Sequence, residues 1–228
     1  MKTLTAMVGL TAWAGAATAT TTVSHYDDLV EGFLGTGFTY NGVQYRDCNN
    51  VGGSFPDGST FTAADVGDNF IIEESTYLFD AFPGWGSREN TLTFGTAYIN
   101  GPNLSLGAFV TAWMDLPQVS NSISMQMAYY ENGPWGGIVF HMDAYRNGGL
   151  VGSDSFTIAN GGGRDNVTLG TLGVSGVEFD SCHIYATNGS DYSAPRLLVD
   201  DLSITAAPAP ASIAGFAALA GLGLRRRR

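Results

Sequence analysis

Short runs of β-branched and aromatic residues, separated by Gly, Asn, Asp and Pro, recur along most of this sequence. The residues within the runs favour strands, and the residues between them favour turns. No long segment combines a helical spacing of apolar residues with capping residues at its ends. Between Ser122 and Tyr129, apolar side chains stand at every second position, as in a half-buried antiparallel strand. The chain is therefore predicted to be all-β.

Two segments carry the signature of a hairpin. Phe38–Tyr40 and Val43–Tyr45 flank Asn41-Gly42, a pair that suits a type I′ turn because both central residues of that turn need positive φ. Ile138–Tyr145 and Leu150-Val151 flank Arg146–Gly149, which predicts a second hairpin with a longer turn.

Nine further strands are expected from the same pattern. They are Asn69–Glu73, Tyr77–Phe79, Thr91–Tyr98, Gly107–Met114, Ser122–Tyr130, Ser155–Ile158, Asn166–Leu169, Val177–Ala186 and Arg196–Thr205. This many strands at such short spacing indicate one antiparallel β-sandwich of the jelly-roll type. We place this domain at residues 20–206.

The N-terminus, residues 1–19, has the features of a secretory signal peptide. Lys2 supplies a positive charge, Leu4–Ala17 is an uncharged and largely apolar stretch, and Ala17-Thr18-Ala19 offers the small residues that a signal peptidase recognises. We expect the apolar stretch to form a hydrophobic targeting helix, and we expect cleavage after Ala19. The alternative is a buried N-terminal helix, which the β-branched threonines that follow disfavour.

The C-terminus, residues 207–228, combines a proline motif, an apolar segment and an arginine cluster. Pro208, Ala209 and Pro210 interrupt any helix, and Ile213–Leu224 is apolar or small. As a helix, with a rise of roughly 1.5 Å per residue, this segment is shorter than the ~30 Å hydrocarbon core of a membrane. The positive-inside rule would hold the cluster in the cytoplasm. The cluster consists of Arg225, Arg226, Arg227 and Arg228. The arrangement favours a hydrophobic helix that stops in the membrane and is then processed.

These C-terminal residues resemble the PEP-CTERM sorting signal of Gram-negative bacteria, although Ala209 stands where that motif usually has glutamate. The resemblance covers the tail alone. It implies an exosortase-type sorting enzyme as a partner. It also implies transport through the inner membrane to the cell envelope or the extracellular matrix. The alternative is an ordinary C-terminal membrane anchor.

The domain between the two ends is strongly acidic. Residues 20–206 contain all 21 acidic residues and five arginines, a formal charge of −16 against −11 for the whole chain, and they contain no lysine. Such a surface repels nucleic acid and anionic lipid and attracts divalent cations. A nucleic-acid-binding function is therefore disfavoured.

Cys48 and Cys182 are the only two cysteines of the chain. In a secreted protein they predict a disulfide, which would close a long loop and stabilise the fold by about 4–5 kcal/mol. The alternative is a pair of buried thiols.

The body of the chain resembles the jelly-roll domains common in PEP-CTERM proteins and, more distantly, carbohydrate-binding modules. Tyr26–Leu29, Val177–Ser181 and Val199–Ile204 carry this resemblance. It spans most of the domain, but it is loose, and it implies a fold more strongly than a ligand.

Acidic residues near the two ends of the domain are predicted to meet, because the first and last strands of a jelly roll commonly lie side by side. Calcium prefers six to eight oxygen ligands, and a bound cation would relieve the repulsion between the carboxylates. The resemblance implies a structural calcium at the same place. The candidate ligands are Asp27, Asp28, Glu31, Asp200 and Asp201. The alternative is that these side chains face solvent or cap turns. Asp65–Asn69 is a weaker candidate without EF-hand spacing.

Two tryptophans lie in Gly/Pro-rich segments, Trp85 and Trp135, and Tyr130 precedes the second. Aromatic rings in such loops can serve as platforms for sugar rings. The alternative is that both tryptophans fold back and close the ends of the sandwich. Trp113, within an apolar run, is predicted to lie in the core.

The sequence offers little for catalysis. The three histidines, His25, His141 and His183, do not have the spacing of a metal site, and no serine lies in a nucleophile-elbow motif. His141 and Asp143 share one face of a predicted strand, where the carboxylate could orient the imidazole. A carboxylate pair for glycoside hydrolysis stays open only because so many acids make some close pair inevitable.

We therefore expect an exported, non-enzymatic β-sandwich with a structural or adhesive role. The second hypothesis is a carbohydrate-binding module with extracellular polysaccharide as its partner, and the third is a glycan-active enzyme. Apart from calcium, no cofactor is expected.

Overall fold

The computed structural model describes residues 18–51, 53–54, 60–61, 70–94, 109–129, 139–157, 167–187 and 197–208. These residues belong almost entirely to one compact unit, Thr20–Ala207. The predicted signal peptide up to residue 17 and the tail from residue 209 lie outside the described residues, and so do the two hydrophobic helices expected there. Within the described residues, no helix is long and apolar enough to cross a membrane.

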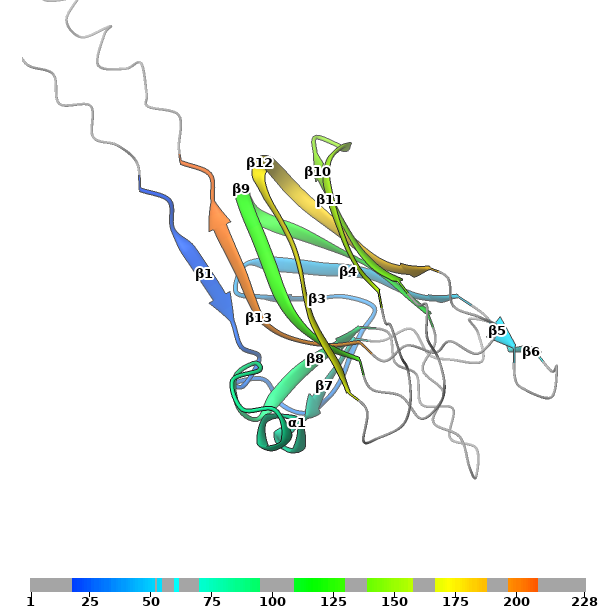
Figure 1. Ribbon diagram of the computed structural model, residues 1–228. Coiled ribbons are helices and arrows are strands. Elements are labelled where there is room, and N and C mark those ends of the chain that lie inside the picture. Colours follow the sequence, from blue (N-terminus) through cyan, green and yellow to red (C-terminus); the bar gives the residue numbers. More distant parts are fainter. Residues whose placement is uncertain are drawn as a thin grey trace, which may run out of the picture. The chain divides into compact units, whose positions relative to one another are not determined.

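The described residues are almost all in antiparallel strands (Figure 1). One short helix, α1 (Thr76–Ala81), accompanies them. The strands are β1 (Thr21–Ser24), β2 (Gly32–Gly35), β3 (Phe38–Tyr40), β4 (Val43–Val51), β5 (Gly53–Ser54), β6 (Thr60–Phe61), β7 (Phe70–Glu74), β8 (Asn90–Phe94), β9 (Phe109–Tyr129), β10 (Val139–Arg146), β11 (Gly149–Thr157), β12 (Thr168–Thr187) and β13 (Leu197–Ala206).

Eleven strands form one hydrogen-bonded sheet that folds into two layers. Its main order is β11-β10-β12-β9-β13-β8-β7-β2, with β1 paired to β13 and the β3-β4 hairpin paired to β9. The long strands β9 and β12 pair along their length and belong to both layers (Figure 1). The first half of β9 pairs with β4 and its second half with β13. Register shifts around Phe179 of β12 interrupt the ladder between the two halves, as expected where a strand bends.

The core fills the space between the layers. The Tyr45 ring of β4 contacts the rings of Phe70 in β7 and Phe94 in β8, at centroid distances of 5.8 and 6.5 Å, although β4 is not a hydrogen-bonded neighbour of β7 or β8. All three side chains are fully buried. The Tyr45 hydroxyl hydrogen-bonds that of Tyr26 at 2.9 Å, which satisfies two polar groups in the core. Burial of each such ring contributes about 1.5–3 kcal/mol to folding.

Both predicted hairpins are present. Asn41 and Gly42 have φ values of 48° and 81° between β3 and β4, as a type I′ turn requires. The second turn is shorter than predicted, because Arg146 pairs with Gly149 and only Asn147 and Gly148 remain between β10 and β11. These two residues also have positive φ, 51° and 79°.

Several predicted elements differ from the observed ones. The segment expected to be the strand Tyr77–Phe79 lies in α1, where Leu78 is buried with Trp85 against Ala128 and Leu198. Tertiary packing outweighs the strand propensity of Tyr and Phe there. The sequence pattern did not predict β1, β2, β5 or β6.

Three pairs of predicted strands are single strands. Gly107–Met114 and Ser122–Tyr130 correspond to β9, Leu150-Val151 and Ser155–Ile158 correspond to β11, and Asn166–Leu169 and Val177–Ala186 correspond to β12. Pro117, which has no backbone N–H to donate, lies where the ladder of β9 is interrupted.

The predicted disulfide between Cys48 and Cys182 is wrong. The two cysteines are not joined, and both side chains are buried. Cys48 lies on β4 and Cys182 on β12, and β9 runs between them. The Cα atoms of the two cysteines are therefore separated by two strand spacings of ~4.8 Å each. This distance exceeds the ~7 Å between Cα atoms that a disulfide can span. Burial raises the pKa of Cys182 to about 12, so its thiol stays protonated.

Candidate functional site

The two ends of the domain do meet at a cluster of polar side chains, here called the acidic junction, formed by His25, Ser87, Gln126, Asp200 and Asp201. The His25 Nδ1 lies 2.6 Å from the Asp201 Oδ1, and the Gln126 amide donates to the Asp201 Oδ2 at 2.8 Å. Potential ligand atoms of His25, Asp200 and Asp201 lie within 4.8 Å of one another. The junction thus joins the segment after β1 to β9, β13 and the loop before β8.

Asp200 is the buried centre of the junction, with no exposed surface. Its Oδ2 accepts hydrogen bonds from the Ser87 amide at 2.7 Å and the Ser87 hydroxyl at 3.0 Å, and its Oδ1 accepts the Asp201 amide at 2.7 Å. Burial nevertheless raises the pKa of Asp200 to about 7, and the neighbouring Asp201 charge adds to the rise. Ionised Asp200 is therefore a costly buried anion at neutral pH.

The structure brings together only part of the predicted calcium set. Asp27 accepts the Asn90 amide at 3.1 Å, and Asp28 accepts the hydroxyl of Tyr40, so both carboxylates have other partners. Glu31 is exposed. Asp200 and Asp201 lie next to each other, and His25 lies beside them. The sequence did not identify His25 as a member of this cluster, although its position directly before Tyr26–Leu29 was a usable signal. The weaker candidate Asp65–Asn69 lies outside the described residues.

Trp85 is not an exposed platform. Only 5% of its surface is accessible, its indole nitrogen donates to the Met127 carbonyl at 3.1 Å, and its ring stacks on Phe79 at 5.4 Å. The Trp85 side chain is therefore folded back onto the sandwich, as the alternative to a sugar-binding platform predicted. Trp135 and Tyr130 lie outside the described residues.

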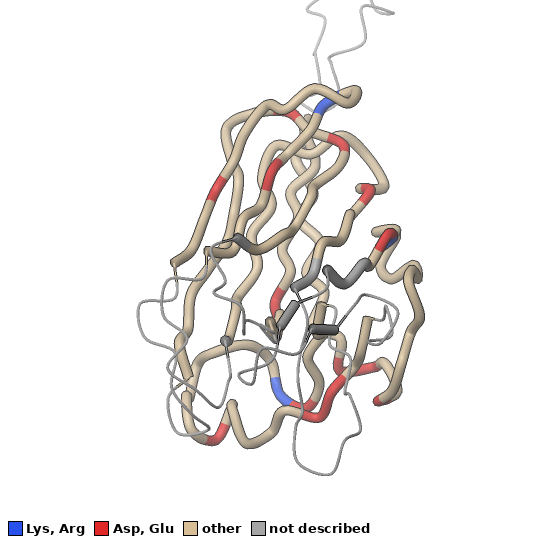
Figure 2. The backbone as a smooth tube through the Cα atoms, turned by 90° about the vertical axis from the view of Figure 1, so that its right-hand side faces the viewer, with Lys and Arg blue, Asp and Glu red and all other residues tan. Residues whose placement is uncertain are grey.

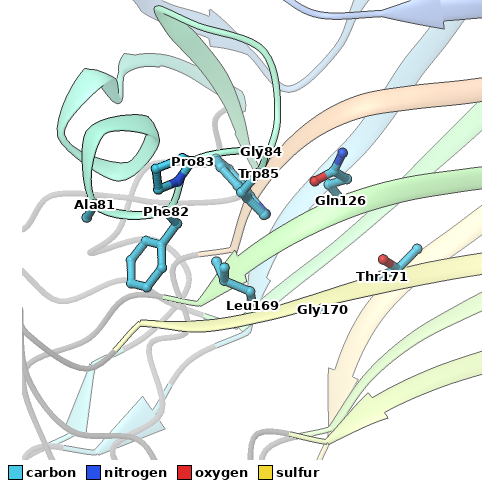
Figure 3. Close-up of a pocket in the computed structure, with 9 residues that line it drawn as sticks. All are labelled: Ala81, Phe82, Pro83, Gly84, Trp85, Gln126, Leu169, Gly170 and Thr171. Atoms are coloured by element: carbon cyan, nitrogen blue, oxygen red, sulfur yellow. The ribbon is translucent and has the colours of Figure 1, made fainter.

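Trp85 also lines an open cavity of about 550 Å³ beside the α1–β8 loop (Figure 3). Phe82, Pro83 and Leu169 supply apolar walls, and Gln126 and Thr171 supply polar groups. The Gln126 oxygen already accepts the Gly86 amide at 2.9 Å, and its nitrogen donates to Asp201. The amide of Gln126 is therefore committed to the acidic junction.

The second cluster lies on the outer face of the layer that contains β4, β9, β12 and β10. Along β9, Ala112 and Met114 are buried in the core, whereas Thr111, Trp113 and Asp115 are half-buried on the opposite face. The prediction that Trp113 lies in the core is therefore wrong. The alternation of β9 sends its side chain outward.

Trp113 belongs to a row of stacked rings, here called the stacked face, formed by Trp113, His183, Tyr185 and His141. Successive ring centroids are 4.6, 4.8 and 4.7 Å apart, with interplanar angles of 11°, 23° and 13°. Cross-strand register explains the row, because Trp113 pairs with His183 and Tyr185 pairs with His141. All four side chains are half-buried.

Charged side chains flank the stacked face. The Arg46 guanidinium lies 5.1 Å from the centroid of the Trp113 ring, while its Nε and Nη2 donate to Asp115 at 2.6 and 3.0 Å. The Tyr185 hydroxyl donates to Asp143 at 3.0 Å. Burial lowers the pKa of His183, and Arg46 lowers it further against the opposing effect of Asp143. His183 is therefore neutral at pH 7 and hydrogen-bonds the hydroxyl of Thr111.

The sequence contained a signal for this face that was only partly used. His141 and Asp143 were expected on one face of a strand, and both are half-buried on the outer side of β10. Residues two positions apart in a strand share a face, and this spacing also relates Trp113 to Asp115 in β9 and His183 to Tyr185 in β12. Their assembly depended on the strand order, which no local pattern revealed.

The described surface is predominantly acidic. Asp and Glu occupy more positions along the backbone than Arg does (Figure 2). Each arginine in the described ranges is ion-paired: Arg46 with Asp47 and Asp115, Arg88 with Asp80, and Arg146 with Asp180.

Comparison with known proteins gives distant likenesses only. No family model and no curated protein matches the chain. Among solved structures, the K2 cleaved adhesin domain of Lys-gingipain has 12% identity and a TM-score of 0.45, covering 81% of this chain and 99% of that one. The K1 adhesin domain from Porphyromonas gingivalis W83 has 10% identity and a TM-score of 0.43, covering 82% and 99%. A family 29 carbohydrate-binding module from Piromyces equi has 11% identity and a TM-score of 0.33, covering 83% and 91%. At these values they assign neither a family nor a function.

Proposed function

We propose that this protein is an exported, non-enzymatic β-sandwich that adheres to extracellular polysaccharide through the stacked face. The observation that carries the proposal is the row of four half-buried rings on the outer face of a layer whose other face is core. Aromatic rings with a polar edge are the side chains that most often anchor ligands on a protein surface. The site is thus a different one from the loop tryptophans considered in the sequence.

The flanking groups favour binding over chemistry. Asp115 is held by Arg46, and Asp143 accepts the Tyr185 hydroxyl, so both carboxylates position neighbouring side chains. The Arg46–Asp115 pair in turn holds the guanidinium close to the Trp113 ring. A preorganised face of this kind loses little side-chain entropy when a ligand binds.

The direct test replaces one ring of the stack. In Trp113→Ala we expect affinity for the bound polysaccharide to fall by about 30-fold, since truncation of a central aromatic anchor costs about 2 kcal/mol. Affinity electrophoresis in polysaccharide-containing gels measures the effect. Phe33→Ala is the matched control, because Phe33 is an aromatic residue on β2 outside the stack and 64% exposed. Equal retention of Trp113→Ala and the wild type would refute the proposal.

The export and sorting of the protein remain part of the proposal and rest on the sequence. The signal peptide would direct secretion. The Pro-Ala-Pro tail would be processed by an exosortase-type enzyme, which would leave the jelly-roll domain at the envelope or in the matrix of a Gram-negative-type bacterium. Deletion of residues 208–228 is expected to shift the protein from the cell-associated fraction into the culture medium, as measured by immunoblotting. Unchanged fractionation would contradict the sorting role.

We also propose that the acidic junction holds a structural divalent cation. The charge of buried Asp200 beside Asp201 supports this, because a cation would neutralise both. Asp200, Asp201 and His25 are the donors that the described residues bring together. Calcium, the cation expected from the sequence, would need further oxygen ligands.

A further inference from the structure

The first half of β12 is the last strand of its layer. Residues 168–175 pair with β9, whereas β10 pairs only with residues 181–187 in the second half of β12. No other strand in the described part of the chain pairs with the first half. The edge that points away from β9 is thus left without a hydrogen-bonded strand from the described residues.

The direction of one amide shows which backbone groups this edge presents. The Gly173 amide donates to the Asp154 Oδ2 on β11 at 2.8 Å, so it points away from β9. In an antiparallel pair, residues that bond to the partner strand alternate with residues whose amide and carbonyl point the other way. The register over residues 168–175 is uninterrupted. Leu169 and Thr171 therefore also turn their amide and carbonyl groups away from β9, toward the open edge.

The open cavity of about 550 Å³ adjoins the same stretch of β12. Leu169 and Thr171 line it from β12, and Phe82 and Pro83 line it from the α1–β8 loop (Figure 3). Thr171 is exposed, whereas Leu169 and Phe82 are half-buried. None of the described residues that line the cavity is charged. The open edge and an uncharged, largely apolar cavity thus lie side by side at Leu169 and Thr171.

The charge of the surroundings favours a cationic partner. Asp154 lies at the end of the open edge, beside Gly173. The domain has a formal charge of −16 over residues 20–206. Each arginine in the described ranges already pairs with a carboxylate. A second copy of the chain would bring the same negative charge, and like charges at an interface reduce affinity. A segment that carries lysine or arginine would be attracted instead.

We propose that the edge of β12 at Leu169 and Thr171 binds an extended, basic peptide segment as an added strand. Strand addition combines main-chain hydrogen bonds at an open sheet edge with pockets that receive alternate side chains. Leu169 and Thr171 supply the main-chain groups, and the cavity receives one apolar side chain of the peptide. Asp154 attracts a lysine or arginine of the peptide and, because it caps the Gly173 amide, limits pairing to the stretch before it. The site shares no residue with the stacked face, so it does not depend on the proposed binding of polysaccharide.

The experiment first selects short random peptides, displayed on phage, on the immobilised protein. We expect the selected sequences to combine an apolar residue with lysine or arginine. Fluorescence anisotropy then measures the affinity of the selected peptide. Serine in place of the apolar residue should weaken binding by about tenfold or more, because the cavity then buries no apolar side chain. N-methylation of successive peptide residues should weaken binding at every second position only, because only those amides point toward β12.

Two substitutions at Thr171 test the edge from the side of the protein. Thr171→Pro removes the amide that points away from β9, a position at which an edge strand tolerates proline. We expect it to lower the peptide affinity by about tenfold or more, with little change in the midpoint of urea unfolding. Thr171→Val keeps the amide and should keep the affinity. Trp113→Ala should also keep it, because Trp113 belongs to the stacked face. If Thr171→Pro fails to fold, the N-methylation series on the wild type tests the same hydrogen bonds.

Equal peptide affinities of Thr171→Pro and the wild type would overturn the inference, and so would an N-methylation series without the alternation. Selection of no peptide, or of acidic peptides, would also contradict it. A concentration-dependent dimer that Thr171→Pro abolishes would assign the edge to a second copy of the chain and thereby overturn the peptide site. All these outcomes leave the proposed polysaccharide binding untouched, because that proposal is tested with Trp113→Ala.

Discussion

Between about pH 4 and about pH 7, the unfolding free energy of the wild-type protein is expected to fall relative to that of Asp200→Asn, by on the order of 4 kcal/mol. Burial raises the pKa of Asp200 from 3.8 to about 7. Across that window the native state therefore holds a proton on Asp200 that the unfolded chain has released. The stabilising contribution of Asp200 is therefore complete below its pKa in the unfolded chain, and it is lost as the pH rises through its pKa in the folded protein.

Urea unfolding of both proteins across this range measures the difference. Burial lowers the pKa of His183, which acts in the opposite direction, but this contribution is common to both proteins and cancels. Asp180→Asn is the matched control. Although burial alone would raise the pKa of Asp180, the Asn147 amide and Arg146 lower it overall, so this carboxylate stabilises above its unfolded pKa. Parallel stability curves for wild type and Asp200→Asn would show that Asp200 is not a buried acid.

The proposed cation makes a linked prediction in the same experiment. A cation that binds ionised Asp200 must stabilise the native state by mass action, and more so at about pH 8 than at about pH 5. Calcium is expected to raise the melting temperature of the wild type accordingly and to have little effect on Asp200→Asn. A melting temperature that neither calcium nor a chelator changes would remove the cation from the acidic junction.

The second large effect is expected at Gly86. A Cβ at this position would lie 2.5 Å from the Asp200 Oδ2 and 2.8 Å from a ring carbon of Phe79. The backbone of Gly86 also has a φ of 61°, which a side chain disfavours. Gly86→Ala is therefore expected to destabilise the fold by about 3–4 kcal/mol, from overpacking and from backbone strain together.

Gly84→Ala separates these two causes. Gly84 also has positive φ, 93°, but a Cβ there would have no atom within 4 Å. Its replacement should cost only the strain, about 1–2 kcal/mol. Equal midpoints of urea unfolding for the two variants would mean that Gly86 does not approach Asp200 as closely as described. A larger loss in Gly86→Ala supports tight packing of this loop on the junction.

Local patterns predicted the parts of the fold that depend on local physics. Asn41-Gly42 and Asn147-Gly148 mark turns, because few other residue pairs adopt positive φ at two successive positions. The alternation within Ser122–Tyr129 reflects a layer with one face in the core. These features could be recognised without knowledge of which strands are neighbours.

The candidate sites could not be recognised in the same way, because long-range pairing creates them. Trp113 lies in an apolar run, yet the register of β9 turns its side chain away from the core. His183 becomes its partner only because β12 pairs with β9. Similarly, His25 reaches Asp201 across 176 positions of sequence. The acidic residues at both ends of the domain were evident in the sequence. The sequence did not show that Asp27 and Asp28 would instead bond to Asn90 and Tyr40.

The pairing of β1 with β13 bears on when the domain can fold. β1 lies beside β13 (Figure 1). Thr21 is aligned with Thr205, and the Ala206 amide donates to the Thr20 carbonyl at 2.9 Å. The first strand to leave the ribosome thus has its partner in the last one. Contacts so distant in sequence form slowly, since a long loop must close before they contribute. In the export that we propose, β1 would remain an unpaired strand until nearly the whole domain had been delivered, and the sheet would be completed late.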